Sequence, residues 1–142
     1  MTRMELEAFT TRHIQAIERH DAVALASDYT PDGIVESPMF ATVQGRSAIE
    51  ASWRAFFTAF PDSQHRIDAV LIDPPRVAIF TTVQATHVNE FFGIPGSHKR
   101  FEIHPVSNMT LENGLIAWER RIYDFTGLLL QIGVLRAKPA KS

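Results

Sequence analysis

The chain has no cysteine. It therefore cannot form a disulfide, use a thiolate nucleophile or bind zinc through sulfur, and we expect a cytoplasmic protein. It also lacks a strong charge of either sign, because the formal net charge is only -2. Nucleic acid and acidic membrane surfaces are thus poor candidates for partners. Finally, no run approaches the roughly 20 apolar residues that a membrane-spanning helix needs.

What remains is typical of a globular protein. The 142 residues are 45% hydrophobic and 21% charged, which suits a folded domain of ordinary size. The sequence shows no internal repeat, low-complexity segment or linker. We therefore predict one soluble domain over residues 1–142, with a flexible tail from about residue 134.

Two helices are predicted from the spacing of a capping box. Thr2 stands three residues before a glutamate, and an apolar stripe continues from there to about His20. Ser47 also stands three residues before a glutamate, and a second stripe runs to Phe60, where a proline follows. This second stripe contains Ile49, Trp53, Phe56 and Phe57.

A shorter helix is predicted between these two. Asp21 can cap a helix over residues 22–29, and the turn-forming residues 30–33 would end it. A brief strand over residues 34–37 would follow.

The rest of the chain is typical of a sheet. Strand-like segments cover residues 65–72, 76–88, 99–111 and 115–124. Asn113-Gly114 separates the last two and predicts a hairpin, because both residues tolerate positive φ. Three helices followed by antiparallel strands predict an α+β fold in which the helices cover a bent sheet.

Strand alternation predicts which side chains face the helices. In residues 99–111 and 76–88 the apolar sets share one face, and His87 ends the second of them. The last strand has no clean apolar face. If Leu115 faces inward, Glu119 and Arg121 enter the hollow as a charged pair; otherwise they form a solvated pair, and a β-bulge can reverse either assignment.

Several segments, in this order, resemble the SnoaL-like polyketide cyclases. They are Ala59-Phe60-Pro61-Asp62, Thr86-His87, Phe92-Gly93-Ile94-Pro95 with Lys99-Arg100-Phe101, and the tail from Asp124 to Gly133. The resemblance covers about residues 32–133. It implies membership of the superfamily of nuclear transport factor two, with ketosteroid isomerase and limonene-epoxide hydrolase. It further implies a cone-shaped α+β roll with one deep apolar pocket, a homodimer, and no metal or organic cofactor.

The sequence departs from its best-known relatives where they carry chemistry. Cyclases of the anthracycline type use a histidine and an aspartate at positions that align with Ser107 and Arg121. Arg121 cannot titrate at a usable pH. Ketosteroid isomerase has its aspartate base where this chain has Ser37, next to Glu36. We therefore expect a different set of catalytic residues.

Four residues are predicted to be catalytic. His87 and Asp124 are the titrating candidates, although a buried histidine can also bond a carbonyl and Asp124 can cap a short helix near Phe125. In a pocket, Glu119 and Arg121 can activate water and polarise an oxygen. The residues predicted to bind substrate are His13, Tyr29, Glu36, Trp53, Phe57, Ser107 and Tyr123. For His13 the alternative is helix packing, and for the tyrosines it is a core position.

The resulting function hypotheses are three. The first is an enzyme without a cofactor that cyclises or isomerises a small hydrophobic carbonyl compound by acid/base chemistry. The second is an epoxide hydrolase in which Glu119 or Asp124 holds the attacking water beside Arg121. The third is a non-catalytic domain that binds a hydrophobic ligand or dimerises.

Overall fold

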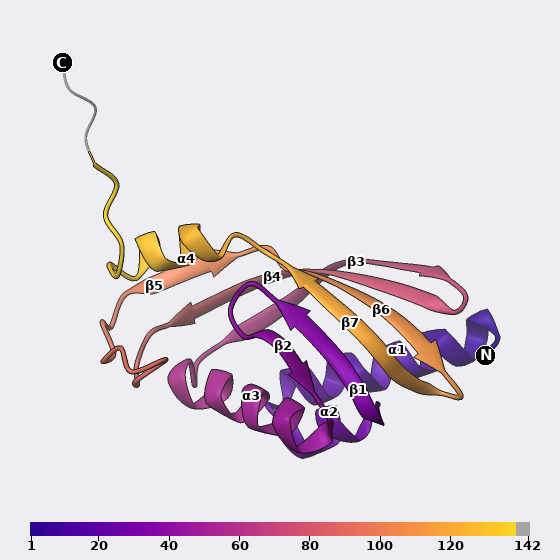
Figure 1. The fold of residues 1–142 in the computed structure, drawn as a ribbon. Helices are drawn as coiled ribbons and strands as arrows, with labels where there is room; N and C mark the ends of the chain where they lie inside the picture. The colour runs from indigo at the N-terminus through magenta and orange to yellow at the C-terminus, as the bar shows by residue number, and fades with distance from the viewer. Residues whose placement is uncertain (139–142) are drawn as a thin grey trace.

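Helices cover the hollow face of a curled seven-stranded sheet in the computed structural model, which describes residues 1–138 (Figure 1). The elements in chain order are α1 (Arg3–Glu18), α2 (Ala22–Ser27), β1 (Tyr29–Ser37), β2 (Ala41–Gln44), α3 (Arg46–Ala59), β3 (Gln64–Asp73), β4 (Arg76–Thr86), β5 (Arg100–Ile103), β6 (Val106–Glu112), β7 (Leu115–Ile122) and α4 (Phe125–Gln131). The predicted α+β class and bent sheet are confirmed. The start of the tail that we expected to be flexible is described, but residues 139–142 lie outside the described part. No helix within residues 1–138 is long and apolar enough to cross a membrane.

The sheet is mixed. Its strand order is β2-β1-β7-β6-β4-β3, and β5 also pairs with β4. The pairs β3–β4 and β6–β7 are antiparallel hairpins, whereas β1 runs parallel to β7. Asn113 and Gly114 have φ of 50° and 83° and connect β6 to β7, as the sequence predicts. The first strand of the chain therefore lies beside the last.

The predicted continuous strand over residues 99–111 is interrupted at His104-Pro105. Both halves, β5 and β6, pair with the same edge of β4. The Pro105 carbonyl accepts a hydrogen bond from the Thr81 amide at 3.0 Å, but proline has no amide to return one. The ladder is therefore broken between β5 and β6.

Helix starts are predicted well at α1 and α2. Thr2 and Glu5 form the capping box, and the Asp21 carboxylate accepts from the Ala24 amide at 3.0 Å. The predicted end of the second helix is wrong, because β1 already begins at Tyr29 and residues 30–33 belong to it. The reason is tertiary: Tyr29 pairs with Ile116 of β7.

The third helix begins differently from the prediction. Gly45, with φ of 89°, is the N-cap of α3 and makes no side-chain cap, so the predicted capping box at Ser47 is wrong. The sequence prediction also missed β2, which pairs with β1 in a hairpin. The residues between these two strands include Met39 and Phe40.

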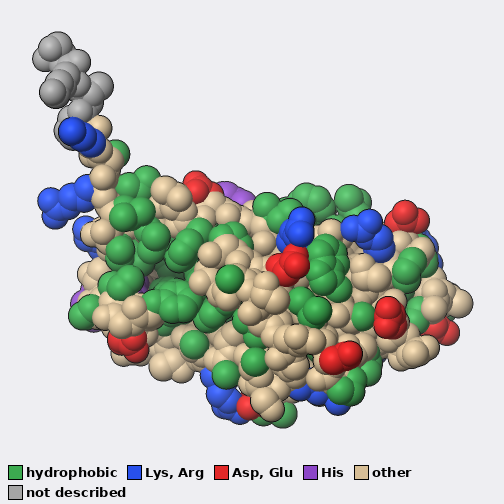
Figure 2. Space-filling view, viewed as in Figure 1, with side chains coloured by type: hydrophobic (Ala, Val, Ile, Leu, Met, Phe, Trp, Pro, Cys, Tyr) green, Lys and Arg blue, Asp and Glu red, His purple; other side chains and the backbone are tan. Residues whose placement is uncertain are grey.

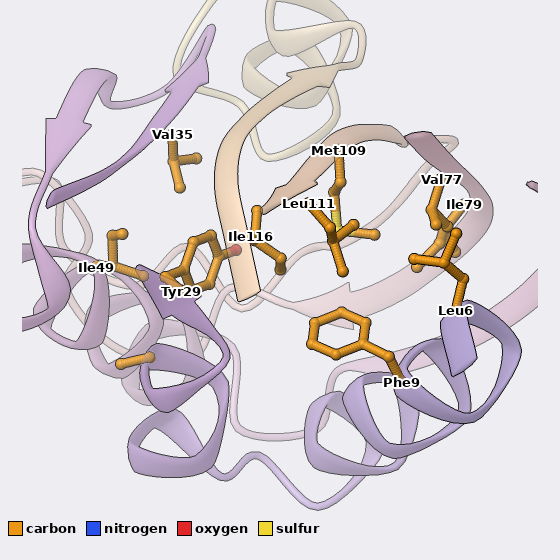
Figure 3. Packing of buried hydrophobic residues seen from close by; sticks show 11 residues of the cluster. Leu6, Phe9, Tyr29, Val35, Ile49, Val77, Ile79, Met109, Leu111 and Ile116 are labelled. Carbon is orange, nitrogen blue, oxygen red and sulfur yellow. The ribbon is translucent and has the colours of Figure 1, made fainter. Parts of the chain in front are cut away.

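One cluster of the hydrophobic core lies between α1 and the sheet. Leu6 and Phe9 of α1 point toward Val77 and Met109, which come from β4 and β6 (Figure 3). Each of these side chains is almost fully buried. Tyr29 belongs to the same cluster, and its hydroxyl oxygen is turned toward Ile116 in Figure 3. A polar atom in such a place requires a partner.

A β-bulge in β7 decides which residues face inward. Thr110 pairs with Trp118 and Leu111 with Ile116, so Ala117 is an extra residue in the ladder. The bulge reverses the alternation. In a regular strand, residues three positions apart point to opposite faces. Because of the bulge, Ile116 and Glu119 are both buried, and Arg121 follows Glu119 on the inner face.

Candidate functional site

A cavity of about 80 Å³ lies under α3, between the helix and the inner face of the sheet. Met39 and Phe40, from the turn between β1 and β2, also line it. The remaining lining residues are Ile17, Ser52, Trp53, Phe56, His65, Ile67, Thr81, Val83, Ile103, Pro105, Ser107, Arg121 and Tyr123. The wall is mostly apolar, and its ionisable members are few. The predicted site residues Trp53, Ser107, Arg121 and Tyr123 are thus brought together.

Glu119 lies directly behind this wall, with a side chain only 1% exposed. Its carboxylate accepts three hydrogen bonds. They come from the Tyr29 hydroxyl, from Ser107 Oγ at 2.8 Å and from Arg121 Nε at 2.9 Å. Both carboxylate oxygens are therefore occupied by groups of the protein itself.

The charge of Glu119 is stabilised in spite of burial. Burial by itself raises the pKa of a carboxyl group. The Arg121 guanidinium, together with the hydrogen bonds from Arg121 and Tyr29, outweighs this effect and lowers the pKa of Glu119 to about 2. Burial and the charge of Glu119 raise the pKa of Tyr29, which stays a neutral donor. Glu119 is consequently a poor proton acceptor, and its charge can hold a cationic side chain in place.

What Glu119 anchors is Arg121, whose side chain is 14% exposed. The guanidinium carbon lies 4.5 Å from the ring centroid of Trp53, in a cation–π contact. Nε donates to Glu119 and Nη2 to the Tyr29 hydroxyl at 3.4 Å. Within residues 1–138, Nη1 has no hydrogen-bond partner. The arginine is held on one side and presents donors on the other.

Further donors line the same cavity. The indole Nε1–H of Trp53 is buried and has no acceptor among the described residues. Burial raises the pKa of Tyr123 to about 12, so its phenol is neutral at physiological pH. An oxygen that enters this cavity would therefore meet hydrogen-bond donors, and no free carboxylate.

His13 supports the cluster from behind. Its Nδ1 lies 2.8 Å from the Asp28 carboxylate, and its ring meets Tyr29 edge-on with 6.2 Å between centroids. It is 2% exposed and does not line the cavity. The helix-packing interpretation of His13 fits this position.

Two predicted substrate-binding residues lie elsewhere. Glu36 is on the outer face, where its carboxylate accepts from Arg120 Nε at 3.0 Å. Phe57 of α3 packs against α2, and its ring stacks on His20 with 4.4 Å between the ring centroids. Neither lines the cavity, because the strand alternation turns Glu36 outward and the helix stripe around Phe57 faces α2.

His87 lies at the opposite end of the sheet. It is fully buried and lines a second hollow of about 280 Å³ between the 88–99 segment and α4, where Figure 2 shows apolar side chains gathered. Its Nδ1 accepts from the Ser97 amide at 3.3 Å. Burial lowers the pKa of His87, which favours its neutral form. The structure does not place His87 in the cavity with Arg121.

Asp124 has the position of a helix cap. Its carboxylate accepts from the Gly127 amide at 2.8 Å, at the start of α4. A Cβ on Gly127 would lie 2.3 Å from Oδ2 of that carboxylate, so a larger residue there would displace the capping side chain. Asp124 is exposed and lines neither hollow. The predicted pairing of His87 with Asp124 as titrating groups of one site has no support in this geometry.

The sequence prediction missed His65 in β3. Burial and the nearby His20 lower the pKa of His65 to about 4. The signal was available, because His65 and Ile67 alternate on one face of a predicted strand, and both line the cavity.

Within the described residues, no group of three or more His, Asp or Glu side chains is placed to hold a metal ion.

The family model of the SnoaL-like polyketide cyclases matches residues 7–132. The chain belongs to that family. No curated protein matches it.

Solved structures share the fold. AclR, a proposed hydroxylase from Streptomyces galilaeus, has a TM-score of 0.82 at 24% identity, covering 95% of this chain and 100% of its own. TsrD from Streptomyces laurentii has a TM-score of 0.81 at 22% identity, covering 95% and 99%. IdmH, a proposed polyketide cyclase from Streptomyces antibioticus, has a TM-score of 0.74 at 21% identity, covering 89% and 97%. At these identities the likeness establishes the fold alone.

The family segments that the sequence displays have structural tasks here. Asp62, after α3, accepts from the Thr86 amide at 2.8 Å and from its hydroxyl at 2.7 Å. Gln131 bonds the backbone of Glu102 twice, which fixes α4 to β5. These two segments therefore connect elements of the fold, and neither Asp62 nor Gln131 lines the cavity.

Proposed function

We propose that this protein is a cofactor-independent enzyme that cyclises or isomerises a small hydrophobic compound carrying two or more carbonyl groups. One observation carries the proposal. Arg121 is nearly buried, is fixed by Glu119 and Trp53, and keeps Nη1 available at an apolar cavity. Donors fixed in a water-poor site stabilise the negative oxygen of an enolate much better than water does.

The residues act on oxygen atoms rather than on the C–H bond. A carbon next to a carbonyl group loses its proton more readily when the carbonyl oxygen is polarised, and water accepts that proton. The enolate carbon then attacks the second carbonyl, and the resulting alkoxide regains a proton. Tyr123, a neutral phenol at the cavity, can supply it. His87 and Asp124 have no part in this mechanism.

Epoxide hydrolysis receives less support. That reaction needs a free carboxylate to hold the attacking water, and both oxygens of Glu119 are already occupied. Simple ligand binding needs no buried ion pair, which is costly to desolvate. The homodimer and the identity of the small-molecule partner stay predictions.

Turnover of a linear diketone whose methyl ketones can close a six-membered ring tests the proposal. Arg121→Met should lower the rate of ring closure by about 10²- to 10³-fold, the usual effect of removing one oxyanion donor. Arg120→Met, next to it but on the outer face, is the matched control and should keep the wild-type rate. The single variant leaves the Glu119 charge buried without a partner and could fail to fold. The double variant Glu119→Gln with Arg121→Met removes both charges, and it should show the same loss of rate. Equal rates for both arginine variants would refute the proposal.

A further inference from the structure

A chain of three polar side chains leads away from the cavity at His65. His65 Nε2 lies 3.2 Å from Ser63 Oγ, and Ser63 Oγ lies 3.1 Å from His20 Nε2. His20 Nε2 also lies 3.0 Å from the Ser63 carbonyl oxygen. Ser63 is only 6% exposed, so its hydroxyl hydrogen needs an acceptor within the protein.

The donor and acceptor capacities of these groups determine where the hydrogens lie. A carbonyl oxygen only accepts, so His20 Nε2 must carry a hydrogen to bond the Ser63 carbonyl. The Ser63 hydroxyl then cannot donate to His20, and its hydrogen goes to His65 Nε2. His65 Nε2 is therefore the bare, accepting nitrogen.

The neutral form of His65 then carries its proton on the other nitrogen, Nδ1. Burial lowers the pKa of His65 to about 4, so the ring is neutral at pH 7. Nδ1 has no hydrogen-bond partner within residues 1–138. Since His65 lines the cavity and Nε2 is engaged by Ser63, Nδ1–H is the group it can offer to a ligand.

We propose that His65 is a further ligand-binding residue, which donates a hydrogen bond from Nδ1 to a carbonyl or enolate oxygen, and that Ser63 and His20 are positioning residues that hold this tautomer. The inference deepens the proposed function and rests on it for the ligand. With Arg121 and the Trp53 indole, the cavity offers three donors from three elements. It thereby favours ligands whose oxygens only accept, such as ketones and enolates, over alcohols and amines.

The tautomer can be measured without any ligand. In protein labelled with ¹⁵N-histidine at pH 7, the proposal expects a protonated Nδ1 and a bare Nε2 at His65. Ser63→Ala should shift the ring toward the Nε2–H form, whereas Ser63→Thr, which keeps the hydroxyl, should retain the wild-type pattern. A wild-type ring with its proton on Nε2 overturns the proposal, whatever the folding of the variants.

Binding of acetophenone and of isopropenylbenzene, a hydrocarbon of the same shape, tests the contact itself. His65→Phe should weaken acetophenone by about tenfold, the worth of one hydrogen bond, and leave the hydrocarbon unchanged. Equal losses for both probes would reduce His65 to a packing role. Because neither measurement uses turnover, failure here is distinct from failure of the cyclisation assay.

Discussion

Two glutamate–arginine pairs lie on opposite faces of the sheet, although their arginines are neighbours in β7. Glu36 and Arg120 pair at 3.0 Å on the outside, with side chains 35% and 56% exposed. Glu119 and Arg121 pair at 2.9 Å on the inside, with side chains 1% and 14% exposed. The chemistry of the groups is the same, and only the direction of the side chains differs. Water screens the outer pair, whereas the inner pair depends entirely on its partners.

The strongest way to break this comparison is to remove one arginine at a time. Arg121→Met should lower the free energy of unfolding by about 3–5 kcal/mol, because it leaves Glu119 buried without a counter-charge. Arg120→Met should cost at most about 1 kcal/mol. Denaturant titration of both variants measures the difference. Similar losses would show that burial does not separate the two pairs.

Acid should act on the inner pair over a defined range of pH. The pKa of Glu119 is about 2 in the folded protein, below the ordinary 4.5, so its charge stabilises the fold above pH 4.5. That stabilisation is lost as the pH falls from about 4.5 toward 2. The gap in stability between wild type and Glu119→Gln should therefore narrow over this range. The same titration with Glu36→Gln is the control, and a gap that stays constant for Glu119→Gln would contradict the assignment.

Removal of one supporting donor should have a smaller effect. Tyr29→Phe deletes the hydroxyl that donates to Glu119 and leaves the ring in the core. We expect a loss of about 1–3 kcal/mol, the cost of an unpaired buried acceptor. Thermal unfolding measures it. Within residues 1–138 the outer pair of Glu36 and Arg120 has no third side chain bonded to its carboxylate. A loss near zero for Tyr29→Phe would therefore show that the third partner adds nothing to the inner pair.

The smallest expected effect concerns Asp124. Asp124→Ala removes the cap of α4 and should cost about 1 kcal/mol. Turnover should not change, because the carboxylate does not line the cavity. Asp124→Asn, which can still cap a helix, should be nearly neutral. A loss of turnover without a loss of stability would restore Asp124 as a catalytic candidate.

Local patterns predicted those parts of the fold that local interactions form. The capping box at Thr2 and the Asn113-Gly114 hairpin depend on residues close in sequence, and both are present. The start of β1 at Tyr29 depends on its pairing with Ile116, more than eighty positions away, so the sequence pattern placed a helix there. Pairing between distant strands overrides local preference.

The candidate site was harder to predict for the same kind of reason. Alternation along β7 left the direction of Glu119 open, and the bulge at Ala117 decides it. His87 ends an inward strand face as predicted, yet that end of the sheet lines another hollow. His65 was missed because the inner face of its strand was not assigned. The sequence therefore predicts the fold and four of the residues that line the cavity, Trp53, Ser107, Arg121 and Tyr123, whereas the bulge in β7 and the role of His65 depend on the tertiary structure.

The ionisation of bound para-nitrophenol, followed by absorbance as the pH is raised, tests the central claim most directly. Phenolate resembles an enolate, and a cavity that stabilises a negative oxygen should lower the pKa of the bound phenol by about one unit relative to water. Arg120→Met should keep this shift, and Arg121→Met should abolish it. A bound phenol whose pKa is raised, as burial in a merely apolar cavity would cause, would contradict the account.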